Sequence, residues 1–112
     1  MICEQFDVVV VPFPFSDLPK SKKRKALVIS SRSFNKANES SVLLMITSAA
    51  KSEWLFDVAI SGLAEAGLNK DCVVRMKTFT LDNGLLLERA GHLRAMDADE
   101  VIKAFKKMCS LT

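Results

Sequence analysis

Apolar residues in this chain gather in short runs separated by polar stretches, a pattern typical of β-strands. The last of these runs follows an Asp-Asn-Gly turn signal at residues 82–84. The runs cover residues 6–15, 26–30, 42–47, 55–60, 72–78 and 85–93. Because most of the chain is occupied by such runs, the pattern predicts a mainly β domain.

A clear helical pattern is confined to the C-terminal region. Asp97 is predicted to cap this helix, and Glu100, three residues later, completes an aspartate form of the capping box. One apolar stripe at helical spacing is formed by Val101, Ile102, Phe105 and Met108. Shorter helical turns are expected at residues 33–38 and 64–67.

Two of the strand-like runs are apolar at consecutive positions, residues 8–11 and 42–46. A strand with one face in water would alternate, so continuous runs indicate that both faces are covered. A domain with one long helix and a small core cannot supply all of this cover, and a second subunit is the simplest source. We therefore expect a homodimer.

Length and composition fit a single small domain spanning residues 1–112. The chain is 49% hydrophobic and 26% charged, which argues against a disordered or fibrous protein. Its cysteines, at positions 3, 72 and 109, are odd in number and widely spaced, so we expect reduced thiols. The sequence has neither a metal-ligand motif nor a glycine loop that cradles phosphate, and no metal or cofactor is expected.

The N-terminal segment lacks the features of an export signal or a membrane helix. Glu4 and Asp7 stand where a signal peptide has basic residues. Pro12 and Pro14 interrupt its apolar run, which is much shorter than the roughly 20 residues that a membrane helix needs. We expect a cytoplasmic protein with no membrane partner.

Basic residues gather in one acid-free stretch, although the net charge is only +3. Within residues 18–38, this stretch contains Lys20, Lys22, Lys23, Arg24, Lys25, Arg32 and Lys36. Such a cluster repels itself unless an anion or an acidic partner lies beside it, and phosphate is the usual anion. A solvated loop that aids solubility is the alternative, and composition alone does not decide between the two.

Antiparallel pairing of the second and third predicted strands would bring two polar side chains together. A register that pairs Ser30 with Ser41 also pairs Arg24 with Thr47, because both pairs of residue numbers have the same sum. Arginine can bind a phosphate through two N–H groups, and threonine can donate a hydrogen bond to a phosphate oxygen. The pair is a candidate phosphate site. A strand-end arginine beside a β-favouring threonine is the structural alternative.

Arg75 interrupts the otherwise apolar run at residues 72–76. A buried charge is costly unless it is paired, so this position requires a partner or a ligand. An ion pair with Asp57 or Asp82 satisfies that requirement, and so does a substrate phosphate. The sequence leaves these possibilities open.

The aromatic residues and the single histidine are weaker candidates. Trp54, Phe15 and Phe79 can stack on unpaired bases, but each also fits the core or a dimer contact. Trp54 is the strongest of the three, because the polar residues 51–53 precede it. His92 is the only histidine, which excludes a two-histidine acid–base pair within one chain and favours a structural role in a strand.

Several segments stand in a recognisable order along nearly the whole chain. They are 7–18 (DVVVVPFPFSDL), 23–30 (KRKALVIS), 46–48 (ITS), 73–75 (VVR), 79–82 (FTLD) and 91–93 (GHL). In order and spacing they resemble the MazF/PemK family of toxins from bacterial toxin–antitoxin systems. Agreement at several motifs is much more specific than agreement at any one of them.

The resemblance implies a compact SH3-like β-barrel with a C-terminal helix, which dimerises and cleaves single-stranded RNA without a metal. In such enzymes the ribose 2′-hydroxyl attacks the adjacent phosphate, leaving a 2′,3′-cyclic phosphate and a 5′-hydroxyl. The family's catalytic arginine and threonine fall on Arg24 and Thr47, and Arg75 matches an arginine that some members use. The expected partner is an antitoxin whose acidic tail lies across the same basic groove.

The expected RNA-binding residues are Lys20, Lys22, Lys23, Lys25, Ser48, Trp54 and Lys77. Two positions depart from the family, because Lys25 replaces a usual proline and Lys77 replaces an aspartate found in some members. The general base is not identified by these residues. Two other functions are compatible with the sequence: a toxin of the same fold that acts on DNA gyrase by protein contact, and a member that binds nucleic acid without cleaving it.

Overall fold

The computed structural model of this chain describes residues 1–12, 22–50 and 53–110, and these residues are mainly β. The elements in chain order are β1 (Asp7–Pro12), β2 (Lys23–Val28), α1 (Arg32–Asn38), β3 (Ser40–Ser48), β4 (Val58–Ala59), β5 (Cys72–Asp82), the 3-10 turn η1 (Asn83–Leu85), β6 (Glu88–His92) and α2 (Ala95–Cys109). The strands form one antiparallel sheet in the order β4-β5-β3-β2-β1-β6.

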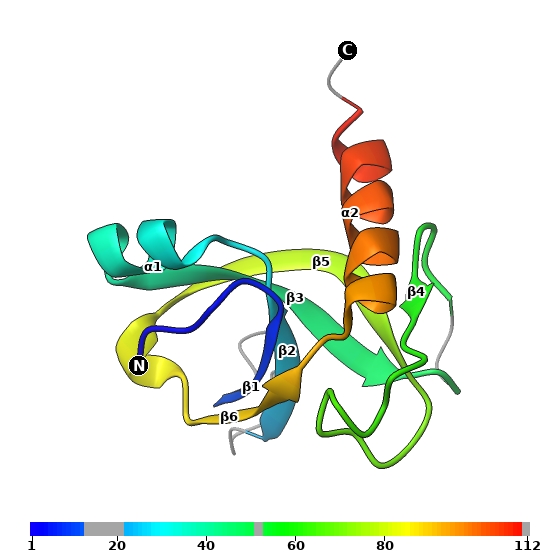
Figure 1. Cartoon of the computed structure of the whole chain (residues 1–112), viewed down its shortest axis with the longest axis horizontal. Helices are drawn as coiled ribbons and strands as arrows, with labels where there is room; N and C mark the ends of the chain where they lie inside the picture. The colour runs from blue at the N-terminus through cyan, green and yellow to red at the C-terminus, as the bar shows by residue number, and fades with distance from the viewer. Residues whose placement is uncertain (13–21, 51–52, 111–112) are drawn as a thin grey trace.

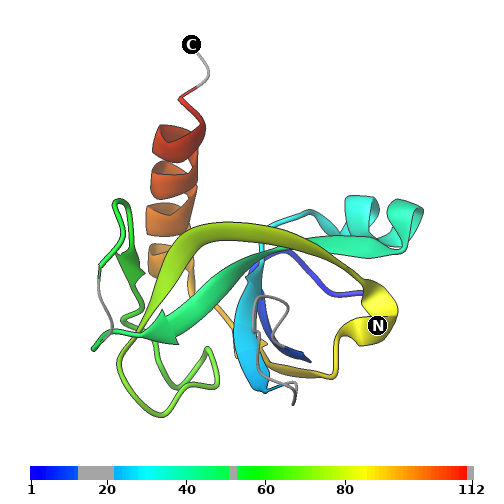
Figure 2. The ribbon, with the colours of Figure 1, turned by 180° about the vertical axis from the view of Figure 1, so that it is seen from behind.

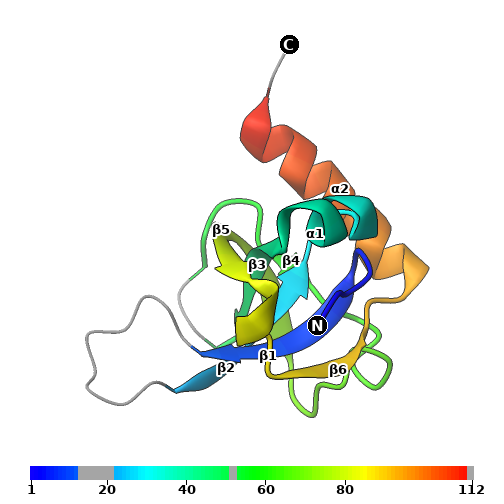
Figure 3. The same ribbon diagram turned by 90° about the vertical axis from the view of Figure 1, so that its left-hand side faces the viewer.

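The sheet is curled into a half-barrel. Its two longest strands, β3 and β5, run side by side in a curved ribbon from α1 to the end of the sheet at β4 (Figures 1 and 2). α2 stands against the β4 end and extends away from β1, β2 and β6 (Figures 1 and 3). The predicted SH3-like β fold with a C-terminal helix and a short helix is confirmed, with the sheet curled into a half-barrel.

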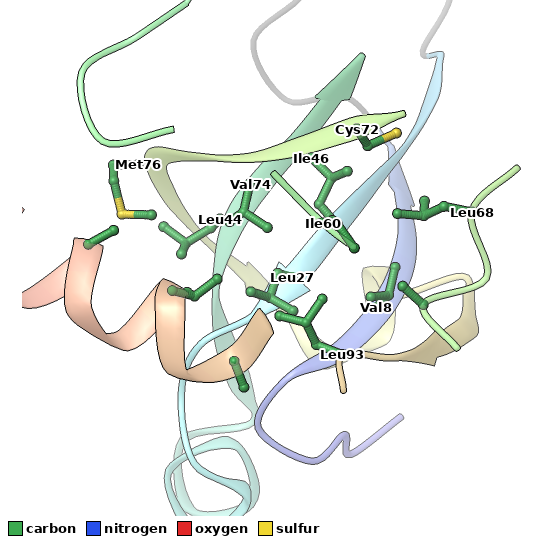
Figure 4. Close-up of a cluster of buried hydrophobic side chains, with 14 residues drawn as sticks. Val8, Leu27, Leu44, Ile46, Ile60, Leu68, Cys72, Val74, Met76 and Leu93 are labelled. Atoms are coloured by element: carbon green, nitrogen blue, oxygen red, sulfur yellow. The ribbon is translucent and has the colours of Figure 1, made fainter. Parts of the chain in front are cut away.

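One hydrophobic core fills the space between the sheet and α2. Val8, Leu27, Leu44 and Val74 contribute fully buried side chains from four strands, and Val101 contributes another from α2. Figure 4 shows the strand side chains pointing toward one another and toward the helix. Phe105 and Met108 of the predicted helical stripe pack against this core. Burial of this helix face fixes α2 against the sheet.

A second core lies on the opposite face of the same strands. Val9 and Val11 belong to this core, whereas Val8 belongs to the first, because successive side chains of a strand alternate in direction. Cys3 and Leu86, from the segments before β1 and after η1, complete it. The expectation that a partner subunit is needed to cover these runs is wrong, since segments of the same chain cover them. A homodimer itself stays a prediction.

The second strand begins three residues earlier than predicted, at Lys23 instead of Ala26. Pairing with β1 extends it, because Lys23, Arg24 and Lys25 stand opposite Pro12, Val11 and Val10. These three basic residues therefore belong to the sheet, whereas Lys22 precedes β2 and Lys20 lies outside the described residues. The predicted first strand ends at Pro12 within the described residues, and its remaining positions, 13–15, lie outside them.

Three other predicted elements differ in extent. The run at 55–60 contains only the short β4, because Trp54 and Asp57 close a turn through reciprocal hydrogen bonds and Phe56 has a positive φ of 71°. The fifth strand continues beyond residue 78 to Asp82. The run at 85–93 starts with η1 and pairs with β1 instead of with the strand that precedes it.

The short helical turn expected at 33–38 is confirmed as α1. Residues 63–67 form hydrogen-bonded turns and no regular helix. In the part of the chain that the structure describes, no helix has both the length and the apolar character needed to cross a membrane.

Asp97 does not cap α2, as the sequence predicted, because the cap position is occupied by Arg94. The Asp97 carboxylate is buried and accepts hydrogen bonds from Ser61 Oγ at 2.7 Å, from the Gly62 N–H at 2.8 Å and from the Ser61 N–H at 3.1 Å. Burial raises the pKa of Asp97, but these hydrogen bonds and the nearby Arg94 outweigh it, so the pKa lies below its ordinary value. Asp97 therefore joins the helix to the loop after β4.

Replacing Asp97 tests this connection. We expect Asp97→Asn to lower the free energy of unfolding at pH 7 by about 2–4 kcal/mol. Both oxygens of the carboxylate accept hydrogen bonds, and the NH2 group that replaces one of them cannot accept any. The stabilisation by the wild-type carboxylate is present above its unfolded pKa of about 4 and is lost as the pH falls through the lower folded pKa. Urea denaturation at pH 7 and at acid pH measures both effects. Equal stability of the variant and the wild type at pH 7 would contradict this role.

Candidate nucleic-acid interface

A groove of about 530 Å³ opens where β2 begins and β3 ends, beside the loop that precedes β5. Its walls come from three segments far apart in the sequence. They are formed by Lys23, Arg24, Lys25, Met45, Ile46, Thr47, Ser48, Leu68, Asn69, Lys70 and Cys72. The groove therefore contains both members of the predicted arginine–threonine pair.

The register of β2 and β3 explains why Arg24 and Thr47 line the same groove. Ala26 pairs with Met45 in the register expected from the sequence, although the pairing ends there and does not extend to Arg24 and Thr47 or, at the other end, to Ser30 and Ser41. Arg24 is two residues before Ala26 and Thr47 is two residues after Met45, so both side chains lie on the sheet face of that pair. Arg24 is exposed and Thr47 is half-buried. A guanidinium and a hydroxyl group thus line one open surface.

The described lining of this groove is basic and contains no acidic residue. Lys23, Arg24, Lys25 and Lys70 contribute the positive charge. Lys25 donates a hydrogen bond of 2.7 Å from Nζ to the carbonyl oxygen of Gly67, which joins β2 to the loop on the other side. Cys72 adds a neutral wall, because burial raises the pKa of its thiol. This combination favours an anionic ligand over a cationic one.

Close packing at Gly67 holds the loop with Asn69 and Lys70 against the sheet. Gly67 has a positive φ of 72°, a conformation that other residues adopt only with strain. A Cβ atom built at this position would lie 2.2 Å from the carbonyl oxygen of Ala90, so no larger residue fits. The backbone conformation at Gly67 therefore fixes one wall of the groove.

We expect Gly67→Ala to destabilise the protein by about 2–3 kcal/mol through steric conflict and backbone strain. Gly84→Ala is the matched control, because an added Cβ at Gly84 meets no atom within 4 Å. Urea unfolding curves of the two variants measure the difference. If the two variants are equally stable, Gly67 does not hold the loop as described.

A second cluster of interest surrounds Arg75. Its Nη2 lies 2.8 Å from Asp57 Oδ2 and its Nε lies 3.2 Å from Oδ1, a bidentate ion pair that is nearly buried. Burial raises the pKa of Asp57, but the hydrogen bonds from Arg75 and from the Trp54 N–H outweigh it, so this pKa is lowered. The hydrogen bond to Asp57 in turn raises the pKa of Arg75. Of the partners expected for Arg75, the structure provides Asp57.

Trp54 lies over this ion pair. The centre of its ring is 5.3 Å from Arg75 Cζ and 5.9 Å from Lys77 Nζ. The residue remains 45% exposed. Trp54 and Lys77, both predicted to bind RNA, therefore belong to one cluster with Arg75, and none of the three lines the groove.

The other predicted contacts are distributed differently. Lys22 is exposed just before β2, Ser48 lines the groove, and Lys20 and Phe15 lie outside the described residues. Phe79 is buried in the second core, as expected if it has a structural role instead of stacking on a base. Within the described residues, no group of histidine, cysteine or acidic side chains could hold a metal ion.

His92 lies at the end of β6 that pairs with the start of β1, away from the groove. Its Nδ1 lies 2.8 Å from Oδ1 of the buried Asp7, at the opposite end of β1 from the position that pairs with Arg24. Arg89 also contacts this carboxylate, at 3.0 Å. The histidine therefore belongs to a polar cluster that supports the β1–β6 pairing.

The family model for the PemK-like, MazF-like toxins of type II toxin–antitoxin systems matches residues 4–109. The chain belongs to this family. A search of curated proteins gives no significant match.

Solved MazF structures have the same fold. MazF from Deinococcus radiodurans is 20% identical, with a TM-score of 0.76 and 99% of each chain covered. The toxin MazF-mt6 from Mycobacterium tuberculosis is 19% identical, with a TM-score of 0.76, and the match covers 95% of this chain and 98% of the toxin. An endoribonuclease from a mycobacterial species, solved with its cognate antitoxin, is 14% identical, with a TM-score of 0.75 and coverage of 99% and 96%. At these identities the likeness establishes the fold alone.

Sequence reasoning missed two parts of the surface of this MazF-like chain. Leu68, Asn69 and Lys70 line the groove, but no strand pattern indicates where their loop lies. The contact of Trp54 with both Arg75 and Lys77 depends on the turn before β4, which the sequence predicted as a strand. In each case the placement follows from tertiary packing, for which residue spacing gives no signal.

Proposed function

We propose that this chain is the toxin of a type II toxin–antitoxin system and cleaves single-stranded RNA, including mRNA, sequence-selectively and without a metal ion. The observation that carries the proposal is the presence of Arg24 and Thr47 in one open, basic groove. Membership of the MazF-like family and the similar endoribonuclease fold support it. Cytoplasmic mRNA is the proposed substrate.

In the proposed reaction the RNA supplies its own nucleophile. The ribose 2′-oxygen loses its proton and forms a bond to the adjacent phosphorus, while the bond from phosphorus to the 5′-oxygen breaks. The leaving oxygen takes up a proton, and the products carry a 2′,3′-cyclic phosphate and a 5′-hydroxyl. Negative charge collects on the non-bridging oxygens, where fixed donors stabilise the transition state most strongly.

Arg24 and Thr47 are proposed to supply these donors. The guanidinium of Arg24 binds the phosphate oxygens and remains charged at any ordinary pH, so it acts as an electrostatic stabiliser. Thr47 donates its hydroxyl hydrogen to orient the phosphate. Arg75 adds a second positive charge, acting less directly than Arg24 because Asp57 binds two of its nitrogens.

The remaining basic residues are proposed to hold the RNA strand. Lys23, Lys25 and Ser48 line the groove, and Lys70 is an addition from the structure. Lys20 and Lys22 extend the positive charge along the chain before β2. Such contacts are made to phosphates and carry affinity more than sequence preference.

The same basic surface suits an acidic antitoxin segment. The mycobacterial endoribonuclease was solved with its cognate antitoxin, and so was MazF of Deinococcus radiodurans, with MazE. We propose an equivalent partner whose acidic tail competes with RNA for the groove. A homodimer of the toxin, as in the family, is part of this proposal.

Cleavage of a long single-stranded RNA in the presence of EDTA tests the function. We expect the wild type to produce 2′,3′-cyclic phosphate ends, and Arg24→Ala and Thr47→Ala each to slow single-turnover cleavage by about 100- to 1,000-fold. Thr47→Ser should recover most of the rate, because it keeps the hydroxyl. Arg32→Ala is the matched control, since Arg32 is half-exposed on α1 and lies outside the groove lining.

Other outcomes would overturn the proposal in distinguishable ways. Cleavage that survives both alanine substitutions would remove the proposed site. RNA binding without cleavage would identify a non-cleaving member of the family. A protein that neither binds nor cleaves RNA but inhibits DNA gyrase would identify the toxin class that acts by protein contact.

A further inference from the structure

We propose that Trp54 is a stacking platform for an unpaired base of the RNA beside the groove, and that Asp57 and Arg75 are positioning residues for its ring. This inference rests on the proposed function and extends it to a separate subsite. Stacking on an exposed aromatic ring binds single-stranded nucleic acid without a strict sequence requirement, because every base has a flat face.

The ring lies close to the groove but outside it. A hollow of about 660 Å³ is lined by Ala49, Glu53, Trp54, Leu55, Phe56, Asp57, Ala59 and Val73. Ala49 directly follows Ser48, and Val73 directly follows Cys72, and both Ser48 and Cys72 line the groove. The two hollows are therefore separated only by the paired ends of β3 and β5, where Val73 stands opposite Thr47. A strand of RNA bound at Thr47 has an adjoining nucleotide within reach of Trp54.

The ring is held in place by a short chain of polar contacts. The Trp54 N–H donates to Asp57 Oδ2 at 3.0 Å, and the Asp57 N–H donates to the Trp54 carbonyl oxygen at 3.2 Å. The same carboxylate binds Arg75, whose guanidinium lies 5.3 Å from the ring centre. One carboxylate thus fixes both the backbone of Trp54 and the cation beside its ring, so little ordering is needed when a base binds.

The positive charge beside the ring favours a nucleic acid. Two acidic residues, Glu53 and Asp57, also line the hollow, and Asp57 is neutralised by its ion pair with Arg75. Arg75 and Lys77 are two residues apart in β5 and approach Trp54 from the same side of that strand, while 45% of Trp54 is exposed. Lys77 adds positive charge beside the ring, with Nζ 5.9 Å from the ring centre. An exposed aromatic ring with positive charge beside it is suited to a base and its phosphate.

Trp54 is the only tryptophan of the chain, so its fluorescence reports on the platform directly. The probe is a short random-sequence 2′-O-methyl RNA, which lacks the free 2′-hydroxyl needed for cleavage. Fluorescence anisotropy of a dye-labelled probe measures binding, and tryptophan emission of the unlabelled mixture measures stacking. We expect emission to be quenched in proportion to the bound fraction.

Variants separate stacking from cleavage. Trp54→Ala should weaken probe binding by about five- to 150-fold and raise KM for RNA, with kcat nearly unchanged. Trp54→Phe should restore most of the affinity. Phe34→Ala is the matched control, because Phe34 is a similarly exposed aromatic, 42% against 45%, on α1 at the other end of β3 (Figure 1). Asp57→Asn should shift the Trp54 emission of the free protein and raise KM for RNA.

The outcomes distinguish the two proposals. Quenched emission, together with weaker probe binding by Trp54→Ala, supports the platform. If unmodified RNA is bound but not cut, the proposed cleavage is overturned and the platform is not. If anisotropy shows that the probe saturates the protein while the tryptophan emission is unchanged, the platform is overturned and the proposed cleavage is not. The same conclusion follows if Trp54→Ala binds the probe as tightly as Phe34→Ala does. Absence of any binding would overturn both. An Asp57→Asn variant with wild-type emission and KM would show that Asp57 does not position the ring.

Discussion

The antiparallel register of β2 and β3 is the constraint on which the candidate site depends. Ala26 stands opposite Met45, and this pairing brings Arg24 and Thr47 onto one face at one end of the sheet. A shift of one residue would turn one of the two side chains to the opposite face. The register is firmly set because both faces of these strands are buried: Leu27 and Leu44 belong to one core, and Ala26 and Met45 belong to the other. The packing of the barrel and the geometry of the groove therefore have one origin.

The groove and the Trp54 cluster share the strands β3 and β5 but differ in their electrostatics. The described lining of the groove is basic and contains no acidic residue, which favours an anionic ligand such as phosphate. In the cluster, Asp57 neutralises Arg75 and fixes it beside the aromatic ring. The first arrangement suits the developing charge of a reaction, and the second suits the flat face of a base. Together they form the surface that we propose binds a single strand of RNA.

The register and the strand-end site could be predicted because local sequence determines them. The apolar positions of β2 and β3 fix the pairing, and strand alternation carries this register two residues further to Arg24 and Thr47, which lie beyond the last pair. Of the predicted stripe on α2, Val101, Phe105 and Met108 pack in or against the core and Ile102 does not, because the buried face is centred on Ala98, Val101 and Ala104. Asp97 was assigned wrongly, because a carboxylate at a helix start can serve either the helix or a distant loop, and here it binds Ser61 and Gly62. The wall at Asn69 and the turn at Trp54 depend on long-range contacts that no spacing rule describes.

A double-mutant cycle on single-turnover RNA cleavage tests the central claim most directly, namely that Arg24 and Thr47 act on the same phosphate. The rates of wild type, Arg24→Ala, Thr47→Ala and the double variant are compared with saturating RNA in EDTA. Groups that stabilise one transition state as a unit are strongly non-additive, so we expect the double variant to be little slower than the slower single variant. Rate losses that simply multiply would contradict the claim, since they would mean that the two side chains act independently.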